Sequence, residues 1–383
     1  MIAKWLETLT GISMFGDRLF RGGAAALLAG LFVFLLMPSF IRTLQRADAT
    51  SDFDASGVKS PPIMGGILIM LAVLFSSVCF SLANSYSISI IAVMIAYGAV
   101  GAADDFLKIK YKKLVAAGKI SKKEWQDKAD GLSSRLRLML YFGFSLAVAI
   151  FAYKFVPGMD GHLTIPFISK NTWYPYLPNW AFIGLICFVV TATANGANFT
   201  DGIDTLISIP IITSAIFVAV VAYVSGNAIF AEYLLLPHLP GVDEVMPIAT
   251  AMIGATLAYL WYNCPPAQIY MGDGGAIGLG GAIGMMFVLI KAELFLPIIG
   301  IIFVLEAMTS FIQIFWFKVT KRTSADKAGR RIFLRAPLHE HYKFKWKDLY
   351  KTPNDVRSKI MWRFHLVSIF ALLVGSLIFF KIR

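Results

Sequence analysis

The sequence predicts an all-α integral membrane protein, a polytopic bundle of about ten transmembrane helices, and three observations support this fold class. Of the 383 residues, 57% are hydrophobic, compared with roughly 45 to 50% in soluble domains. The mean hydropathy is +0.69. The basic residues behind the net charge of +12 lie between apolar stretches, as in cytoplasmic loops that face anionic lipid. This segregation excludes nucleic acid as a partner and favours the lipid bilayer.

Ten apolar stretches are long enough to cross a bilayer, which takes about 20 helical residues. We expect them to form a single transmembrane domain over residues 1–383. The three scattered cysteines predict neither a disulfide framework nor a zinc site. The predicted spans are 22–41, 63–83, 87–105, 138–156, 179–197, 204–224, 244–263, 275–293, 295–317 and 362–381.

The distribution of basic residues predicts the orientation of the bundle. Residues 108–137 contain ten Lys or Arg and residues 318–359 contain thirteen, whereas residues 84–87 and 225–243 contain none. Basic loops stay in the cytoplasm, so ten spans place both termini outside. The predicted cytoplasmic loops are 42–62, 106–137, 195–205, 264–274 and 318–362. Every unusual polar motif falls in or beside one of these loops, which predicts an active site at the cytoplasmic face.

The segment NGANFTDGIDTL, residues 195–206, lies between two apolar runs and holds Asn195, Asn198, Asp201 and Asp204. Ionisable groups at membrane depth are costly and mark functional sites. The simpler interpretation is that Asn198 or Asp201 caps the following helix. Capping accounts for one of the four polar residues, so we favour a polar site.

The third predicted span ends in two adjacent carboxylates, Asp104 and Asp105. A helix C-terminus disfavours acidic residues, so stability does not explain them. If the helix continues, Asp104, Lys108 and Lys112 share one face. That face is either a solvated charged stripe or a carboxylate pair for a metal or proton, flanked by ammonium groups for phosphate.

The loop after Asn263 reads CPPAQIYMGDGGAIGLGG, with Asp273 between glycines before a new helix. Backbone amides there can face an anion while the carboxylate takes a cation. This combination suits a magnesium diphosphate, because Mg²⁺ uses one or two carboxylates plus phosphate oxygens and water. The alternative is that the glycines only permit close helix packing.

Three further polar features are weaker. Lys59 precedes SPPIMGG, which is also a plain turn sequence. Glu306 and Gln313 lie near one helix face, for interhelical hydrogen bonding or for substrate. His339 and His341 flank Glu340 in RRIFLRAPLHEHYKFKW. These histidines are too few for a transition-metal site, and the segment also fits an interfacial helix.

Four motifs together resemble the polyprenyl-phosphate N-acetylhexosamine-1-phosphate transferase superfamily: DDFLK at 104–108, NxxNxxDGxD at 195–204, YMGDGG at 270–275 and APLHEH at 336–341. The last one, with the preceding RIF, resembles the phospho-N-acetylmuramoyl-pentapeptide transferases. The resemblance implies Mg²⁺-dependent transfer of phospho-MurNAc-pentapeptide from UDP-MurNAc-pentapeptide to undecaprenyl phosphate in the bacterial cytoplasmic membrane. The products would be UMP and lipid I, in the first membrane step of peptidoglycan synthesis.

The matching motif positions imply a role for each candidate residue. Asp273 would hold the metal, and Asp104, Asp105 and Asp204 would be catalytic. Glu340 replaces the middle residue of the family's three histidines, and residues 114–130 resemble an insertion. The implied substrate-binding residues are Lys59, Lys108, Lys112, Asn195, Asn198, Asp201, Asn263, Tyr270, Gln313, His339 and His341.

Two other functions and two mechanisms stay open. A sister transferase would use UDP-GlcNAc or another UDP-sugar. A secondary transporter would place its polar residues near the membrane midplane. For the transferase, the acceptor phosphate attacks the diphosphate directly, or an aspartate first forms a covalent intermediate. A homodimer is also an open alternative.

Overall fold

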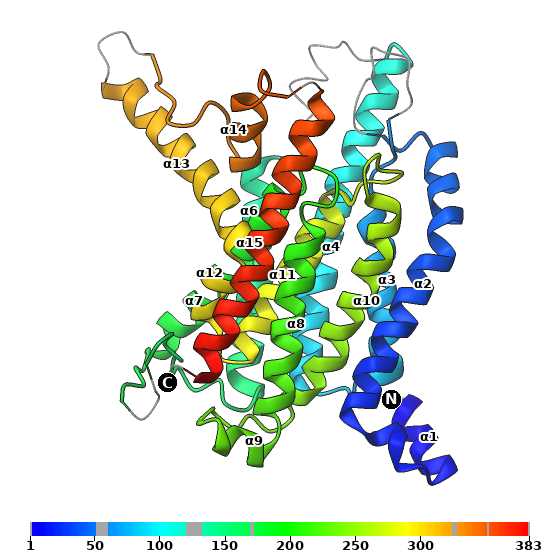
Figure 1. The fold of residues 1–383 in the computed structure, drawn as a ribbon, viewed down its shortest axis with the longest axis vertical. Helices are drawn as coiled ribbons and strands as arrows, with labels where there is room; N and C mark the ends of the chain where they lie inside the picture. The colour runs from blue at the N-terminus through cyan, green and yellow to red at the C-terminus, as the bar shows by residue number, and fades with distance from the viewer. Residues whose placement is uncertain are drawn as a thin grey trace.

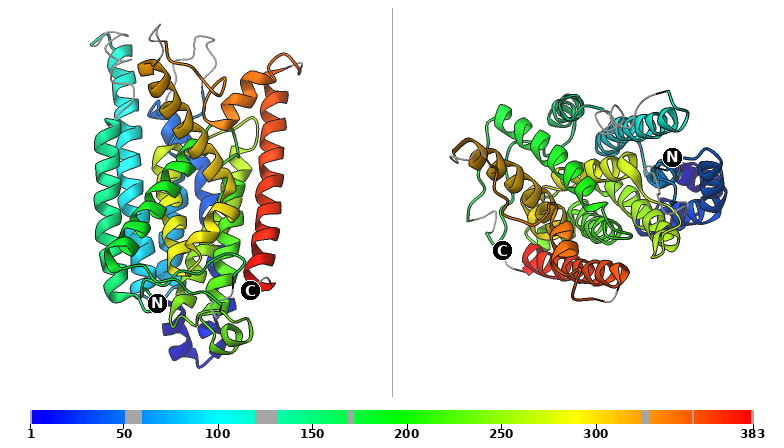
Figure 2. Two further views of the ribbon diagram at one scale, coloured as in Figure 1. Left: turned by 90° about the vertical axis from the view of Figure 1, so that its left-hand side faces the viewer. Right: turned by 90° about the horizontal axis from the view of Figure 1, so that it is seen from above.

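Long helices run side by side in one bundle (Figures 1 and 2). The computed structural model describes residues 2–50, 60–119, 132–168, 172–323, 328–350 and 352–381. Within these residues, nine helices are long and apolar enough to cross a membrane, and a tenth apolar helix is shorter. The predicted polytopic all-α membrane bundle is therefore confirmed. The three cysteines are free, as expected.

The helical elements follow one another with short connections. In chain order they are α1 (Ile2–Thr10), η1 (Ser13–Gly16), α2 (Arg18–Arg46), α3 (Gly65–Phe80), α4 (Ser85–Ala116), α6 (Ser134–Phe155), α7 (Asn179–Thr200), α8 (Ser208–Ser225), α9 (Ala228–Tyr233), η2 (Val242–Glu244), α10 (Val245–Asn263), α11 (Gly272–Leu289), η3 (Glu293–Phe295), α12 (Leu296–Ile299), α13 (Ile301–Thr323), α14 (Leu338–Lys345) and α15 (Pro353–Lys381).

The prediction that Asp104 and Asp105 end a helix is wrong. Helix α4 begins with a capping box between Asn84 and Ser87 and continues to Ala116, so both carboxylates lie inside it. Hydropathy marks only the apolar part of a helix, whereas the residues after Asp105 are mostly good helix formers. The continued helix places Asp104 and Lys108 four residues apart in an ion pair.

Other predicted boundaries differ for related reasons. Helix α8 begins at Ser208, not at residue 204, because residues 201–207 form turns. The predicted span 295–317 is divided at Gly300 into α12 and α13. Helix α15 begins at Pro353, nine residues earlier than predicted, and its first turns bury Val356 and Ile360 under a polar outer surface.

Helix α11 lies in the middle of the bundle and is buried along nearly its whole length. Its glycines allow α4 and α7 to approach closely. A Cβ atom on Gly278 would lie 3.1 Å from the Cα of Gly98, and one on Gly280 would lie 2.5 Å from the Cβ of Ala197. The glycines after Asp273 therefore serve packing, and the same packing fixes the start of α11.

The two chain termini lie at one end of the bundle, and the segments with the predicted motifs lie at the other (Figure 1). At that second end, the end of α7 meets the first turn of α11, and Asn263 at the end of α10 bonds the loop before α11. Helix α13 leans away from its neighbours there, and α14 lies between α13 and α15 (Figure 1). We call this end of the bundle the motif end. Its assignment to the cytoplasm stays a prediction.

Candidate active site

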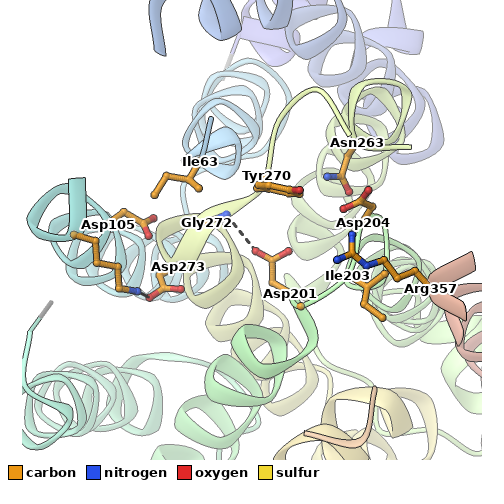
Figure 3. A pocket seen from close by; sticks show the side chains of 12 residues that line it. Ile63, Asp105, Asp201, Ile203, Asp204, Asn263, Tyr270, Gly272, Asp273 and Arg357 are labelled. Atoms are coloured by element: carbon orange, nitrogen blue, oxygen red, sulfur yellow. Dashed lines mark hydrogen bonds and ion pairs between the residues drawn. The ribbon is translucent and has the colours of Figure 1, made fainter. Parts of the chain in front are cut away.

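A cavity of about 350 Å³ opens at the motif end, and four aspartates line it. Asp105 comes from α4, Asp201 and Asp204 from the turn after α7, and Asp273 from the first turn of α11 (Figure 3). Carboxylates from three distant segments thus face one space. The other lining residues are Ile63, Lys108, Gly202, Ile203, Asn263, Tyr270, Gly272 and Arg357.

Two cations hold Asp273 and Asp104 together at one side of the cavity. The Nζ atom of Lys108 lies 2.6 Å from Oδ2 of Asp273 and 2.9 Å from Oδ2 of Asp104. Arg137 places Nη1 3.0 Å from the same oxygen of Asp104 and 3.7 Å from Asp273. Asp104 is fully buried, and its other oxygen accepts a hydrogen bond from the amide of Leu132 at 2.6 Å. Asp104 therefore orients the cations, while Asp273 reaches the cavity.

The start of α11 offers backbone amides to the other two central carboxylates. Gly274 N–H donates to Oδ2 of Asp105 at 3.1 Å, and Gly272 N–H donates to Oδ2 of Asp201 at 3.2 Å. Gly272 has φ +80°, and a Cβ atom there would lie 2.8 Å from Asp105. Only glycine fits this close approach without strain. The positive end of the helix dipole faces these carboxylates. That the same amides face a substrate anion stays a prediction.

The two proline- and glycine-containing motifs bind each other through their backbones. The amide of Gly65 donates to the carbonyl of Tyr270 at 2.9 Å, and the amide of Tyr270 donates to the carbonyl of Pro62 at 2.9 Å. Gly66 N–H donates to the carbonyl of Met271 at 2.9 Å. The PPIMGG segment is thus more than a turn, because it fixes the loop that leads to Asp273.

The turn at residues 201–207 projects its carboxylates into the cavity. Asp201 ends α7, and Ile207 precedes α8 without a side-chain cap, so the capping interpretation is wrong. Asn263 holds the turn by accepting from Thr205 N–H at 2.7 Å, and Asp204 accepts from Ala267 N–H at 3.4 Å. Burial, followed by the nearby negative charge of Asp273, raises the pKa of Asp201 well above its ordinary value.

Comparison with known proteins identifies relatives that match most of this chain. Residues 87–291 match glycosyl transferase family 4. The phospho-N-acetylmuramoyl-pentapeptide-transferase of Desulfotalea psychrophila is 36% identical over 367 residues, covering 94% of this chain and 92% of that protein. The protein of the same name from Gluconacetobacter diazotrophicus is 35% identical over 378 residues, covering 96% and 94%. The chain belongs to glycosyl transferase family 4. Within the family, the resemblance to the phospho-N-acetylmuramoyl-pentapeptide transferases is confirmed.

The residues that match the family profile include all four cavity aspartates and Lys108. Other residues implied by the resemblance lie outside the cavity lining. Asn195 donates to the carbonyl of Thr191 within α7 at 2.8 Å, and Lys112 contacts Thr50. Asn198 lies on α7, one turn before Asp201. Lys59 and most of the insertion at residues 114–130 lie outside the described residues.

The predicted residues of α13 and α14 bind neighbouring segments. Gln313 accepts from the amides of Ile332 and Phe333 at 3.1 and 3.0 Å and lines a separate hollow of about 460 Å³. The Nδ1 atom of His341 accepts from the amide of Leu334 at 3.1 Å. His339 lies directly behind the cavity wall.

Sequence reasoning missed two arginines at the site. Arg137 pairs with Asp104. Arg357 on α15 lines the cavity on the side opposite Asp105 and Asp273 (Figure 3). Both lie close to the predicted cytoplasmic ends of their spans, where arginine is ordinary. The sequence offered one signal, which is that both arginines fall in predicted cytoplasmic loops that also hold the motifs.

The donor set suits a hard divalent cation. Four aspartates line the cavity beside two cationic side chains, Lys108 and Arg357, and carboxylate oxygens are the protein ligands that Mg²⁺ prefers. Within the described parts of the chain, no group of three or more His, Cys, Asp or Glu side chains is arranged to hold a metal ion alone. A cation here would complete its shell with water and phosphate oxygens, which is common for Mg²⁺.

Proposed function

We propose that the chain transfers phospho-MurNAc-pentapeptide from UDP-MurNAc-pentapeptide to undecaprenyl phosphate, giving lipid I and UMP. The names of the two relatives, which match over nearly the whole chain, support this reaction. The observation that carries the proposal is the convergence of Asp105, Asp201, Asp204 and Asp273 with Lys108 in one cavity. Neither the sister transferase nor the transporter is favoured by the comparisons. Three of the four cavity aspartates lie just beyond the last residue of α7 or in the first turn of α11, and so at helix ends.

Asp273, with Asp105 and Asp201 nearby, would hold Mg²⁺ in this site. When bound, the cation would neutralise the charge that develops on the diphosphate. Lys108 now neutralises Asp273, and its ammonium group can instead bind a phosphate oxygen once a cation occupies the carboxylate. Asp104 keeps Lys108 and Arg137 directed toward the cavity in either arrangement.

The proposed step is direct attack by an oxygen of undecaprenyl phosphate on the β-phosphorus of the UDP-sugar. A new P–O bond forms to the acceptor, the bond from the β-phosphorus to the bridging oxygen breaks, and UMP leaves with that electron pair. A phosphate monoester is mostly dianionic at neutral pH, so Asp105 needs to do little as a base. Positioning and charge neutralisation dominate such transfers.

In this proposal the nucleotide binds at the Arg357 side of the cavity. There, Tyr270, Asp204 and Arg357 also line an adjoining hollow of about 430 Å³. The ring of Tyr270 offers a stacking face for uracil, and the Arg357 guanidinium can donate to two oxygens of one phosphate group. Asn263 serves this region indirectly, since its amide bonds the backbone of Thr205 and Ile269.

The motif end faces the cytoplasm in this proposal, and both termini lie outside. Residues 318–359 contain thirteen Lys or Arg, which favours a cytoplasmic location. The bacterial inner membrane follows from the lipid acceptor. Soluble UDP-MurNAc-pentapeptide would then reach the cavity from the cytoplasm while undecaprenyl phosphate stays in the bilayer.

A UMP-release assay tests the function. The purified protein is reconstituted with undecaprenyl phosphate and given UDP-MurNAc-pentapeptide or UDP-GlcNAc, with Mg²⁺ or with a chelator. We expect UMP and lipid I only from the first nucleotide and only with Mg²⁺. Faster turnover of UDP-GlcNAc would favour the sister transferase, and substrate movement without UMP release would favour a transporter. A phospho-sugar bound covalently to the enzyme in the absence of acceptor would contradict direct attack.

A further inference from the structure

Glu306 lies in the second turn of α13 and is fully buried. Both of its carboxylate oxygens contact one residue of α14. The amide of His339 donates to Oε1 at 3.1 Å, and Nδ1 of the same histidine lies 2.9 Å from Oε2. A buried carboxylate is costly unless it is paired and hydrogen-bonded, and His339 provides both kinds of partner.

The other edge of the His339 ring faces the cavity wall. A Cβ atom on Gly202 would lie 2.2 Å from Nε2 of His339, so the imidazole leaves room only for glycine at that position. Glu340 places Oε1 3.5 Å from the same Nε2. The ring is thus held between Glu306 on one side and the turn of Gly202 on the other.

The turn of residues 201–207 has few supports of its own. It lies between α7 and α8, and Thr205 has φ +63°, a strained conformation for a non-glycine residue. Side chains from other elements hold it. Asn263 accepts from the amide of Thr205 at 2.7 Å, and Nε2 of His365 lies 3.1 Å from the carbonyl of Thr205. The His339 ring is the corresponding support at Gly202, which lies between Asp201 and Asp204 of the cavity lining.

We propose that Glu306 is a positioning residue for the reaction: through His339, it holds the turn that presents Asp201 and Asp204 to the substrate. The role rests on the proposed function. Glu306 does not line the cavity, so its effect passes through the imidazole, whose ring orientation and Nδ1 proton it fixes. Partners of this kind typically change activity by about 10- to 100-fold when removed.

The test compares two buried glutamates. Glu306→Gln keeps the size of the side chain and removes its charge. Glu293→Gln is the matched control, because Glu293 is also buried and lies in η3, beyond the opposite end of α11 from Asp273. Lipid I formation is measured together with hydrogen exchange of the peptide that contains residues 202–206. We expect Glu306→Gln to lower kcat about 10- to 100-fold and to speed exchange in this peptide, with neither change in Glu293→Gln.

A double-mutant cycle with His339→Ala decides whether Glu306 acts through the histidine. If it does, Glu306→Gln changes kcat less than about twofold in the His339→Ala background, since coupled residues are non-additive. Equal losses in both backgrounds, or wild-type kcat and exchange in Glu306→Gln, would overturn the proposal. If Glu306→Gln does not fold, Gly202→Ala tests the same contact from the other side, and normal activity and exchange there would also overturn it. A wild-type protein that makes no lipid I would refute the proposed function, while the exchange comparison still tests the support of the turn.

Discussion

The two ends of the bundle bury charge in opposite ways. Near the end with the termini, Arg21 forms a bidentate pair with Glu244, with both N–O distances at 2.8 Å and both residues 4% exposed. Leu82 N–H also donates to Glu244 at 2.6 Å. At the motif end, Lys108 and Arg137 are shared between Asp104 and Asp273, and three further aspartates line the cavity.

The difference separates structural charge from functional charge. In a buried ion pair with full hydrogen bonding, the two charges neutralise each other and no charged group remains to bind a ligand. An excess of carboxylates in a cavity destabilises the empty protein, and the entry of a cation relieves the repulsion and lets a phosphate substrate bind. Variants at the two ends should therefore lose different properties.

The largest expected effect is on catalysis, in Asp273→Asn. Removing this carboxylate takes away the proposed metal ligand while keeping its size, so UMP release should fall at least about 1,000-fold. The unfolding temperature should change little or rise, because one of the crowded carboxylates is neutralised. Activity and thermal unfolding are measured on the same preparation. Near-wild-type turnover at ordinary Mg²⁺ would contradict the metal assignment.

The opposite effect is expected for Glu244→Gln. It leaves Arg21 as a buried charge without its carboxylate, which costs about 3 to 5 kcal/mol of stability. The folded fraction should keep its KM for UDP-MurNAc-pentapeptide, since the pair lies far from the cavity. Unfolding in denaturant and steady-state kinetics check both statements. The double variant Arg21→Met with Glu244→Leu should recover stability, and failure to recover would mean that the pair does more than balance charge.

Much of the fold and part of the site were predictable from local sequence. Hydropathy found the ten apolar helices of the described part of the chain, because a span must be apolar over its length. It misplaced the ends of α4 and α15, since polar residues such as Lys108 and Arg357 continue these helices beyond the apolar core. Helix length and membrane-span length are different quantities.

The aspartates were predictable because carboxylates at membrane depth are costly and mark functional sites. The side chains that pair with them were not predictable. Arg137 reaches Asp104 across 33 residues, and His339 reaches Glu306 across the same number. Such pairs depend on which helices pack together, which a single sequence does not specify. For this reason Glu306 was grouped with Gln313 on its own helix, whereas its actual partner lies on α14.

A smaller effect is expected for Arg357→Ala, which tests whether the second cation of the cavity serves substrate rather than stability. The KM for UDP-MurNAc-pentapeptide should rise about tenfold, equivalent to about 1.4 kcal/mol of binding, with unfolding unchanged. Arg363→Ala is the control, because Arg363 lies on the same helix and covers the ring of Trp346 at 4.8 Å. An unchanged KM in Arg357→Ala would remove this arginine from the nucleotide site.

The smallest effect is a pH dependence of stability at the motif end. Burial disfavours the imidazolium of His339, but the hydrogen bonds and charges of Glu306 and Glu340 outweigh it and raise its pKa above the ordinary 6.5. The interaction of protonated His339 with the two glutamates therefore stabilises the fold fully below pH 6.5. This stabilisation is lost as the pH rises through the raised pKa. The hydrogen bond from His339, together with Lys343, lowers the pKa of Glu340 to about 2. The stability that the Glu340 carboxylate contributes is therefore constant above its ordinary pKa of 4.5.

The difference in unfolding temperature between the wild type and Glu306→Gln should therefore shrink as the pH rises from about 5 to about 9. Glu244→Gln provides the reference for pH effects elsewhere in the bundle, since Glu244 pairs with an arginine and not with a histidine. Thermal unfolding of the three proteins at matched ionic strength measures the trend. A difference that grows with pH would mean that His339 is neutral beside Glu306. The turn would then be held by a hydrogen bond from a neutral imidazole to the Glu306 carboxylate, and not by an ion pair between Glu306 and His339.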